Sequence, residues 1–252
     1  MRTNKEIIFE GYAAAKYAQA AYSDFDSLRT NLRQRNLYEP GDPLYNLTEE
    51  SEDVEAYAHY SCDRQELWVF VRGTERLSHK DWVRDISLLP KKWQGYKGHR
   101  GMRNGAKEIY DALLPIMAKH PGDIIICGHS LGGGISTWLQ IALKGAASAV
   151  HTFGSPRVLS YSSSKRFNSL MRDQHIRWVN GSDIVPRLLW WIYKHVGRMF
   201  FIDPGWDLLT NGDAEKSARY MRWRSIKSFG RKGFSEHSIE DYLMCIAHQC
   251  DQ

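Results

Sequence analysis

The chain has 252 residues, and its hydrophobic and charged fractions of 42% and 25% are those of an ordinary globular protein with a sizeable core. No apolar run reaches the roughly 18 residues of a membrane span, and the four cysteines have neither zinc-like nor thioredoxin-like spacing, which argues against a membrane-spanning protein and a zinc or disulfide scaffold. The formal net charge of +5 is compatible with an anionic membrane surface or an acidic partner, and equally with simple solubility.

The amino-terminal stretch indicates the compartment of the protein. "MRTNKEIIFEGYAAAKYAQAAY" lacks the short apolar block and the small-residue cleavage site of a secretory signal. Because the cysteines are expected to be free thiols, the sequence predicts a cytoplasmic protein. Export by a route that leaves no amino-terminal signal stays open.

The first 73 residues predict a helix followed by a hairpin. Residues 5–21 are rich in alanine and place apolar or aromatic residues at helical spacing. Two strand-like runs follow at 54–60 and 66–73, and the polar stretch "SCDRQ" between them suits a tight turn. We therefore expect an antiparallel edge to the sheet.

From residue 100 onward, helical and strand-like segments alternate. The pattern predicts helices at 103–119, 131–144 and 161–173 and strands at 122–128, 148–156 and 175–180, with Pro115 as a kink or an early stop. This alternation predicts an α/β fold with a mostly parallel, mixed sheet and helices on both faces. No repeat or linker marks a boundary, so a single domain over residues 1–252 is expected.

Residues 128–132 spell Gly-His-Ser-Leu-Gly between a predicted buried strand and a helix. This is the context of a nucleophile elbow, in which Ser130 occupies a strained turn and Gly128 and Gly132 let the strand and the helix approach. The five-residue pattern alone occurs often by chance. The order of strand, turn and helix makes it indicative of a nucleophilic serine, provided that a base and an acid lie nearby.

An elbow of this kind requires an acid and then a histidine later in the chain. Asp183 follows the strand 175–180 in a Gly-Ser-Asp turn, and His237 stands at the start of an amphipathic terminal helix. The alternatives are an ordinary turn aspartate and an ordinary helix-start histidine. The other histidines weighed as the base are less well placed: His99, His129, His151, His195 and His248.

Attack on an ester also requires two donors for the developing oxyanion. One is expected to be the backbone amide of Leu131, the residue after the serine. The other should come from an early strand end, where Arg72, Gly73 and Thr74 lie. By itself, that stretch also reads as an unremarkable strand terminus.

An ordered set of short motifs runs through most of the chain from about residue 50 onward. In chain order they are "FVRGT" (70–74), "DWVRD" (81–85), "GHRGM" (98–102), "CGHSLGGG" (127–134), "TFGSPRV" (152–158), "GSDIVPRL" (181–188), "YKHVG" (193–197) and "HSIEDYL" (237–243). With these motifs the chain resembles the class 3 (fungal-type) lipase family of the α/β-hydrolase superfamily. The ordered set is far more specific than the central pentapeptide.

The resemblance implies a role for each candidate residue. Ser130 would be the nucleophile, Asp183 the orienting acid and His237 the general base, with oxyanion amides from Thr74 and Leu131. No metal and no organic cofactor is implied. One departure from the family pattern is Met102, where a bulky aromatic is usual; this replaces one large apolar residue by another.

Three segments bear on the substrate. The aromatic stretch 188–202 includes Trp190 and Trp191, which suit either a lipid-docking rim or core packing. The basic aromatic stretch 217–233 suits anionic head groups or a solvated helix; it could also contact nucleic acid, but no nucleic-acid fold motif accompanies it and no such partner is expected. By resemblance, residues 75–96 are expected to cover the site as a lid.

These observations predict a serine carboxylic ester hydrolase, a lipase that cleaves acyl esters of lipids, with transient membrane-surface contact. One alternative is a membrane-damaging effector of the phospholipase A1 type. Another is a catalytically inactive lipase-like scaffold that only binds. The sequence leaves open the acyl-chain length, the head group and the oligomeric state.

Overall fold

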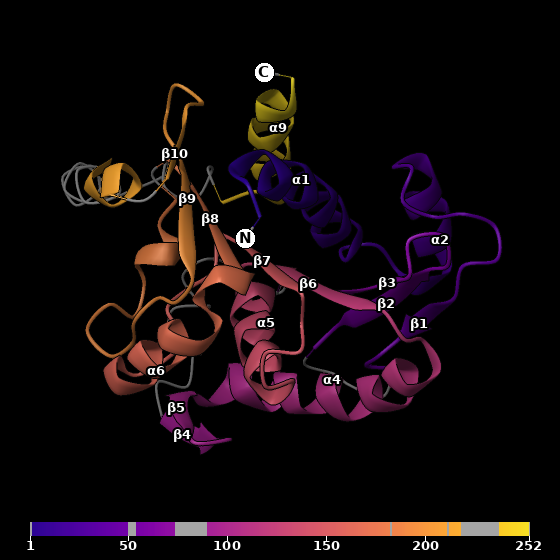
Figure 1. The fold of residues 1–252 in the computed structure, drawn as a ribbon, viewed down its shortest axis with the longest axis horizontal. Coiled ribbons are helices and arrows are strands. Elements are labelled where there is room, and N and C mark those ends of the chain that lie inside the picture. The colour runs from indigo at the N-terminus through magenta and orange to yellow at the C-terminus, as the bar shows by residue number, and fades with distance from the viewer. Residues whose placement is uncertain are drawn as a thin grey trace.

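An eight-stranded sheet forms the centre of the computed structural model, which describes residues 2–49, 54–73, 90–181, 183–210, 212–217 and 237–251 (Figure 1). The five inner strands run parallel, and the outer strands pair antiparallel. This confirms the predicted α/β class with a mostly parallel, mixed sheet. In spatial order the strands are β1 (Leu44–Asn46), β2 (Ala56–Ser61), β3 (Glu66–Val71), β6 (Asp123–His129), β7 (Ala149–Phe153), β8 (His175–Asn180), β9 (Arg198–Ile202) and β10 (Leu208–Thr210).

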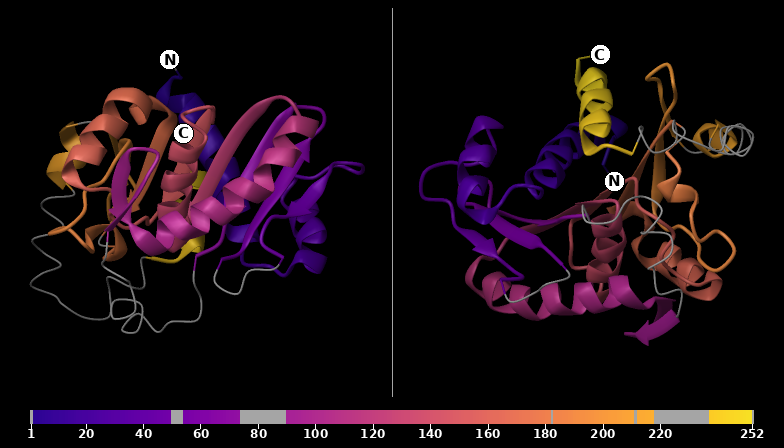
Figure 2. Two further views of the ribbon diagram at one scale, coloured as in Figure 1. Left: turned by 90° about the horizontal axis from the view of Figure 1, so that it is seen from below. Right: turned by 180° about the vertical axis from the view of Figure 1, so that it is seen from behind.

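Helices cover both faces of the sheet, as Figures 1 and 2 show. One face carries α1 and α9, which pack against each other, and the opposite face carries α4, α5 and α6. Parallel strands in such a sheet have no free face, so they are expected to be apolar on both sides. The helices are α1 (Asn4–Ala20), α2 (Phe25–Gln34), α4 (Arg100–Lys119), α5 (Leu131–Ala142), α6 (Tyr161–Met171) and α9 (Ile239–Cys250).

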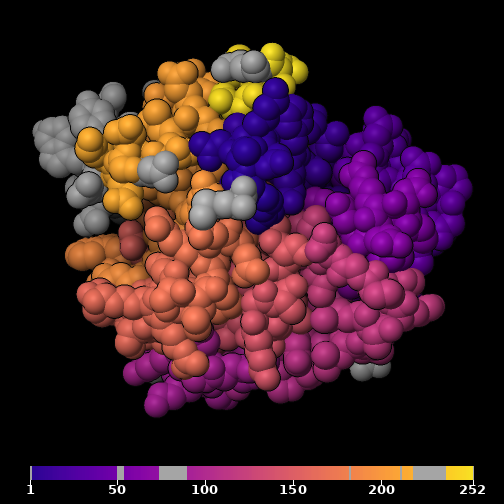
Figure 3. All heavy atoms as spheres, in the orientation of Figure 1, coloured from indigo at the N-terminus to yellow at the C-terminus, as the bar shows by residue number. Residues whose placement is uncertain are grey.

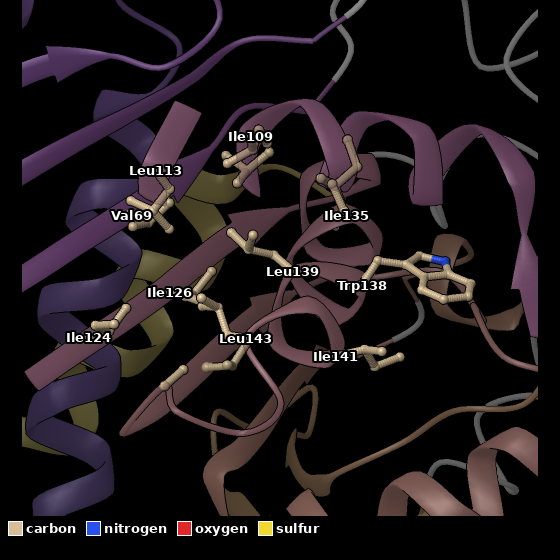
Figure 4. Close-up of a cluster of buried hydrophobic side chains, with 14 of the residues drawn as sticks. Val69, Ile109, Leu113, Ile124, Ile126, Ile135, Trp138, Leu139, Ile141 and Leu143 are labelled. Atoms are coloured by element: carbon tan, nitrogen blue, oxygen red, sulfur yellow. The ribbon is translucent and has the colours of Figure 1, made fainter. Parts of the chain in front are cut away.

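The alternation of side chains along the inner strands produces two cores. Val69 of β3 and Ile126 of β6 pack with Leu139 of α5 in the core beneath α4 and α5 (Figure 4). Trp68 and Phe70, which flank Val69 in β3, point to the other face of the sheet and pack beneath α1. All five side chains are buried, and burial of each contributes about 1.5–3 kcal/mol. The two cores together hold the carboxyl ends of the strands at one edge of the sheet.

The first and last helices position one end of the candidate site. The amino terminus of α1 is closed by a capping box, in which the Thr3 hydroxyl accepts from the amide of Glu6 and the Glu6 carboxylate accepts from the amide of Thr3. Ser238 caps α9, and its hydroxyl accepts from the amide of Glu240. In Figure 3 the indigo amino-terminal residues lie against the yellow carboxyl-terminal ones. His237 therefore precedes a helix that is fixed at its start and packed along its length.

Several elements differ from the sequence-based expectation. Helix α4 begins three residues earlier than predicted and continues through Pro115, because its apolar stripe is buried on both sides of the proline. Six further elements were not predicted, since their runs are brief, lie in the aromatic stretch or overlap the expected lid: α2, β1, β4 (Pro90–Trp93), β5 (Tyr96–His99), β9 and β10. No helix among the described residues is both long and apolar enough to span a membrane.

Two predicted segments fall largely outside the described residues. Of the expected lid at 75–96, residues 75–89 are not described, and the rest lies in a hairpin of β4 and β5. Of the basic stretch 217–233, only residue 217 is described. The lid and the role of the basic stretch stay predictions.

Candidate active site

Ser130 sits at the turn between β6 and α5. Its backbone has φ 55° and ψ −125°, a conformation that a residue with a side chain rarely adopts and that costs on the order of 1–3 kcal/mol. A Cβ atom added to Gly128 would lie 2.5 Å from the carbonyl carbon of Gly132, so neither the strand end nor the helix start tolerates a larger residue at this point. The elbow therefore has the strained geometry that the sequence predicted.

The fold brings Ser130, Asp183 and His237 together, and we call these three residues the triad. Nε2 of His237 lies 2.9 Å from Oγ of Ser130, and Nδ1 lies 2.9 Å from Oδ2 of Asp183. Because a carboxylate only accepts hydrogen bonds, Nδ1–H donates to Asp183 and Nε2 is left to accept the Ser130 proton. All three side chains are buried, with 8% of Ser130 and 7% of His237 exposed.

The carboxylate of Asp183 is held by two further donors. The backbone amide of Val185 donates to Oδ1 at 2.9 Å, and the hydroxyl of Tyr242 donates to Oδ2 at 2.7 Å. Burial and the neighbouring carboxylate raise the pKa of Tyr242 well above its ordinary value, so this hydroxyl keeps its proton and remains a donor. Tyr242 lies in the motif "HSIEDYL", but its contact with the acid was not predicted.

Gly154 lies directly against the acid and the base. Its backbone is left-handed, with φ +59°, and an added Cβ atom would lie 2.8 Å from Oδ2 of Asp183 and 2.9 Å from Nδ1 of His237. Only glycine combines this backbone conformation with such a close approach. The motif "TFGSPRV" thus contains a residue whose absent side chain makes room for the triad.

His129 connects the elbow to the loop that carries the base. Its Nε2 lies 2.6 Å from the backbone carbonyl oxygen of His237, to which it donates, so Nδ1 accepts from the hydroxyl of Tyr22 at 2.7 Å. Burial and the nearby His237 lower the pKa of His129 well below its usual value, so the ring stays neutral. His129 is therefore not placed as a base for Ser130, as expected, but it anchors the backbone of the base.

The predicted oxyanion donors are only partly described. Leu131 is the first residue of α5, so its amide lies at the positive end of the helix dipole next to Ser130. Thr74 lies outside the described residues. The residue before it, Gly73, is close to the elbow, because an added Cβ atom would lie 3.1 Å from Cβ of Ser130. The strand end named from the sequence thus reaches the serine, and the oxyanion roles stay a proposal.

The remaining histidines make other contacts. Nδ1 of His99 accepts from the amide of Met102 at the start of α4, and His151 lies 2.6 Å from a carboxylate oxygen of Glu10. His195 donates through Nε2 to the carbonyl oxygen of Pro186. Among the described residues, no group of three or more His, Cys, Asp or Glu side chains is arranged to hold a metal ion.

Trp190 and Trp191 project into solvent from the loop that follows the acid. They are 50% and 58% exposed, and their rings meet edge to face at 6.0 Å. The preceding Leu189 is buried and has φ 62°, and its carbonyl accepts from the amides of Ile192 and Tyr193 in a tight turn. The two tryptophans are exposed, so they are not packed in a core, and contact with lipid stays a proposal.

Comparison with known proteins identifies similar sequences and folds. The sequence model of the family described as Lipase (class 3) matches residues 68–192. The secreted mono- and diacylglycerol lipase 3 of Gibberella zeae is 32% identical over 108 residues, which are 40% of this chain and 34% of that protein. The chloroplastic phospholipase A1 PLIP1 of Arabidopsis thaliana is 30% identical over 133 residues, which are 46% of this chain and 20% of that protein.

The same fold occurs in solved lipase structures. The triacylglyceride lipase of Rhizomucor miehei superimposes with a TM-score of 0.66 at 20% identity, covering 83% of this chain and 84% of that one. At this identity the likeness concerns the fold. The chain spans between about a fifth and about a third of the length of the two curated relatives described above.

Proposed function

Because this chain belongs to the class 3 lipase family, we propose that it cleaves carboxylic esters of lipids through an acyl-enzyme on Ser130. The observation that carries this proposal is the unbroken hydrogen-bond chain from Asp183 through His237 to the serine hydroxyl. A scaffold that only binds has no need of a strained serine joined to a base and an acid. The binding-only reading is therefore disfavoured.

In the first half of the proposed cycle, His237 makes Ser130 nucleophilic. Nε2 of the imidazole removes the hydroxyl proton while Oγ attacks the ester carbonyl carbon, and the carbonyl oxygen becomes an oxyanion. The Asp183 carboxylate stabilises the imidazolium that forms and keeps Nδ1 protonated. When the tetrahedral intermediate collapses, the ester C–O bond breaks and Nε2–H protonates the departing alcohol.

In the second half, water replaces the alcohol. His237 removes a proton from the water as its oxygen attacks the acyl carbon, and collapse returns that proton to Oγ of Ser130 with release of the carboxylic acid. The cycle uses only groups of the chain and water. We assign the oxyanion contacts in both halves to the backbone amides of Leu131 and Thr74, where each donor is worth on the order of 3–4 kcal/mol in the transition state.

A lipid substrate and contact with a lipid surface are supported by the exposed tryptophans. Trp190 and Trp191 lie in the loop that follows Asp183, and tryptophan favours the boundary between water and lipid. Docking of this rim would bring an aggregated substrate to the edge of the sheet where the triad lies. The named relatives include both an acylglycerol lipase and a phospholipase A1, and we propose acylglycerols first, with phospholipids as the second candidate.

The first experiment compares the purified chain with Ser130→Ala on p-nitrophenyl esters from acetyl to palmitoyl, then on diacylglycerol and phosphatidylcholine. We expect activity that rises with acyl length and disappears in the variant. Labelling with a fluorophosphonate should occur at Ser130 and persist in Ser162→Ala, which removes an exposed serine of α6. If the chain and Ser130→Ala behave alike on every ester and neither is labelled, the binding-only reading takes first place.

A second experiment tests the docking rim. The double variant Trp190→Ala and Trp191→Ala should lose activity on lipid vesicles while hydrolysis of soluble acetyl ester is unchanged. Trp206→Ala is the matched control, because that tryptophan is 43% exposed in the turn between β9 and β10. Equal vesicle activity in the double variant and the control would contradict docking through this loop.

A further inference from the structure

A strongly basic cavity lies beside β8 and β9, toward the β10 end of the sheet. Its volume is about 740 Å³, within the range of small-molecule sites. Its lining comes from α6, the short helix η2 (Val185–Arg187) and the strands β8 and β9, among other segments. The triad is not part of its lining.

The cavity carries an excess of positive charge. Among the described residues that line it, five bear a fixed positive charge and one, Glu215, bears a negative charge. The five basic residues are Arg157, Arg172, Arg177, Arg187 and Lys194.

Arg177 is the most telling member of this set. It belongs to β8 and shares its face of the strand with Val179, which packs with Phe201 in a small core cluster. Its Nε atom is buried, and within the described part of the chain that atom has no hydrogen-bond partner. Burial and the nearby Arg157 lower the pKa of Arg177 to about 10, so the guanidinium is still charged at neutral pH. The side chain is partly buried at the cavity wall with Glu215 as a nearby carboxylate, and an anion in the cavity would stabilise its charge further.

The remaining lining indicates the size and character of that anion. Planar guanidinium groups match the oxygen atoms of phosphate in pairs, and a cluster of several is typical of phosphate recognition. The cavity is larger than a single phosphate ion, and apolar side chains line one part of it: Val179, Pro186, Met199 and Phe201. A phosphate group attached to an organic portion fits both halves of this lining.

We propose that this cavity is a binding site for a phosphate-bearing anion, held by Arg177 together with Arg157, Arg172 and Lys194. The phosphate group is supplied either by a soluble organic phosphate or by a lipid head group. Two lining residues, Arg187 and Lys194, flank Trp190 and Trp191 in the sequence. A lipid surface that docks on these tryptophans would therefore meet the segment that lines the cavity. The site does not depend on hydrolysis at Ser130.

The test measures binding to the full chain carrying Ser130→Ala, so that no substrate is turned over. In the soluble arm, thermal unfolding is followed with inorganic phosphate and with glycerol 3-phosphate, against sodium chloride of equal ionic strength. In the lipid arm, the protein is sedimented with phosphatidylcholine vesicles with and without phosphatidic acid. Arg177→Met, which keeps an unbranched side chain but removes the charge, should weaken binding about tenfold or more.

Two further variants keep the result interpretable. Lys194→Gln alters a loop residue of the cavity and replaces Arg177→Met if that variant fails to fold. Lys165→Gln is the matched control, because it removes one positive charge from the exposed surface of α6 outside the cavity. Binding lost in the cavity variants and kept in the control supports the proposal.

The two arms identify the source of the phosphate. A shift with glycerol 3-phosphate indicates a soluble ligand, and binding only to vesicles with phosphatidic acid indicates a lipid head group. If neither arm shows binding, or if the cavity variants and the control bind equally, the proposal is overturned. Each of these outcomes is independent of ester hydrolysis, so the proposed function and the phosphate site can fail separately.

Discussion

The candidate triad has a counterpart of the same chemical order elsewhere in the fold. In this second series of hydrogen bonds, Nε2 of His59 lies 3.1 Å from a carboxylate oxygen of Asp42, and Nδ1 lies 2.6 Å from the hydroxyl of Tyr17. The same series of hydrogen-bonded groups, a carboxylate, an imidazole and a hydroxyl, thus occurs twice in the fold. We call Asp42, His59 and Tyr17 the sealed chain, because all three are buried where α1 packs against the antiparallel edge of the sheet.

The triad and the sealed chain differ in the surroundings of the hydroxyl group. Tyr17 stacks on Trp68 at a centroid distance of 4.5 Å and packs against Phe70, so the rings leave no approach for a substrate. Burial raises the pKa of Tyr17 well above its usual value, so the phenol stays protonated. Ser130 instead occupies a strained turn at the strand edge, beside the first amide of α5. Backbone strain and a nearby helix amide, rather than the order of hydrogen-bonding groups, distinguish the candidate active site from this structural network.

The largest expected difference between the triad and the sealed chain is in the effect of removing the hydroxyl group. Ser130→Ala should lower kcat by about 10⁴- to 10⁶-fold, because it removes the nucleophile. Tyr17→Phe should leave kcat within about twofold and reduce the free energy of unfolding by about 1–2 kcal/mol, because a buried nitrogen loses its partner. Ester hydrolysis and urea unfolding measure the two effects. A comparable loss of kcat in Tyr17→Phe would mean that the sealed chain takes part in the reaction.

The carboxylates provide the next comparison. Asp183→Asn should lower kcat by about 10⁴-fold, because an amide does not hold the imidazole in the required tautomer or stabilise its charged form. Asp42→Asn should preserve kcat and cost about 1–3 kcal/mol of stability. Fluorophosphonate labelling rates, measured beside unfolding curves, separate these outcomes. Equal labelling by Asp183→Asn and the unaltered chain would remove the acid from the mechanism.

Gly154→Ala tests whether the triad requires the absence of a side chain at position 154. The added methyl group would displace Asp183 or His237, and a misplacement of about 1 Å costs on the order of 100-fold in rate. The matched change Gly212→Ala meets no atoms within 4 Å and should leave kcat unaltered. Steady-state kinetics of both variants, with circular dichroism as a check on folding, decide the matter. Unchanged kcat in Gly154→Ala would show that the triad tolerates the shift.

The imidazole of the sealed chain contributes to the pH dependence of stability. Burial lowers the pKa of His59, and it lowers the pKa of His99 to about 4 and of His175 to about 3. The unfolded chain binds protons at these histidines near pH 6.5 and the folded chain does not, so stability is lost as the pH falls below 6.5. Each group contributes up to about 1.4 kcal/mol per pH unit, down to its folded pKa.

Urea unfolding at pH 7, 6 and 5 measures this slope. His175→Gln removes one group that binds a proton only in the unfolded state, so it should reduce this slope by about 1.4 kcal/mol per pH unit below pH 6.5. A free energy of unfolding that stays constant between pH 7 and 5 would contradict the assignment of neutral, buried rings.

The smallest expected effect concerns the anchor of the base. Tyr22→Phe leaves Nδ1 of His129 without its donor and loosens the backbone carbonyl of His237, so kcat should fall about three- to tenfold with little change in KM. Tyr38→Phe is the control, since that ring packs beside His59 in the sealed chain. A rise in KM with constant kcat would instead place Tyr22 in substrate binding.

The order of the central-sheet strands from β2 to β8 and of the helices between them could be predicted from the sequence, because each carries its own hydrophobic pattern, whereas the β4–β5 hairpin was not predicted. The short strands β9 and β10 could not be predicted, since they lie in or near an aromatic stretch without alternation and gain their register from neighbours. The helix through Pro115 shows the same limit. Its continuation depends on burial against the sheet, and this outweighs the local cost of the proline.

The sequence by itself determined the elbow around Ser130 and the order in which an acid and a histidine follow it, because glycine spacing and strand-to-helix transitions are local properties. Only the tertiary structure decided which side chains surround these three residues. Tyr22 and His129 are 107 positions apart, and Tyr242 and Asp183 are 59 apart. Contacts over such separations, and the basic cavity beside β8, arise when the sheet closes and its strand edges meet, and no local pattern encodes them.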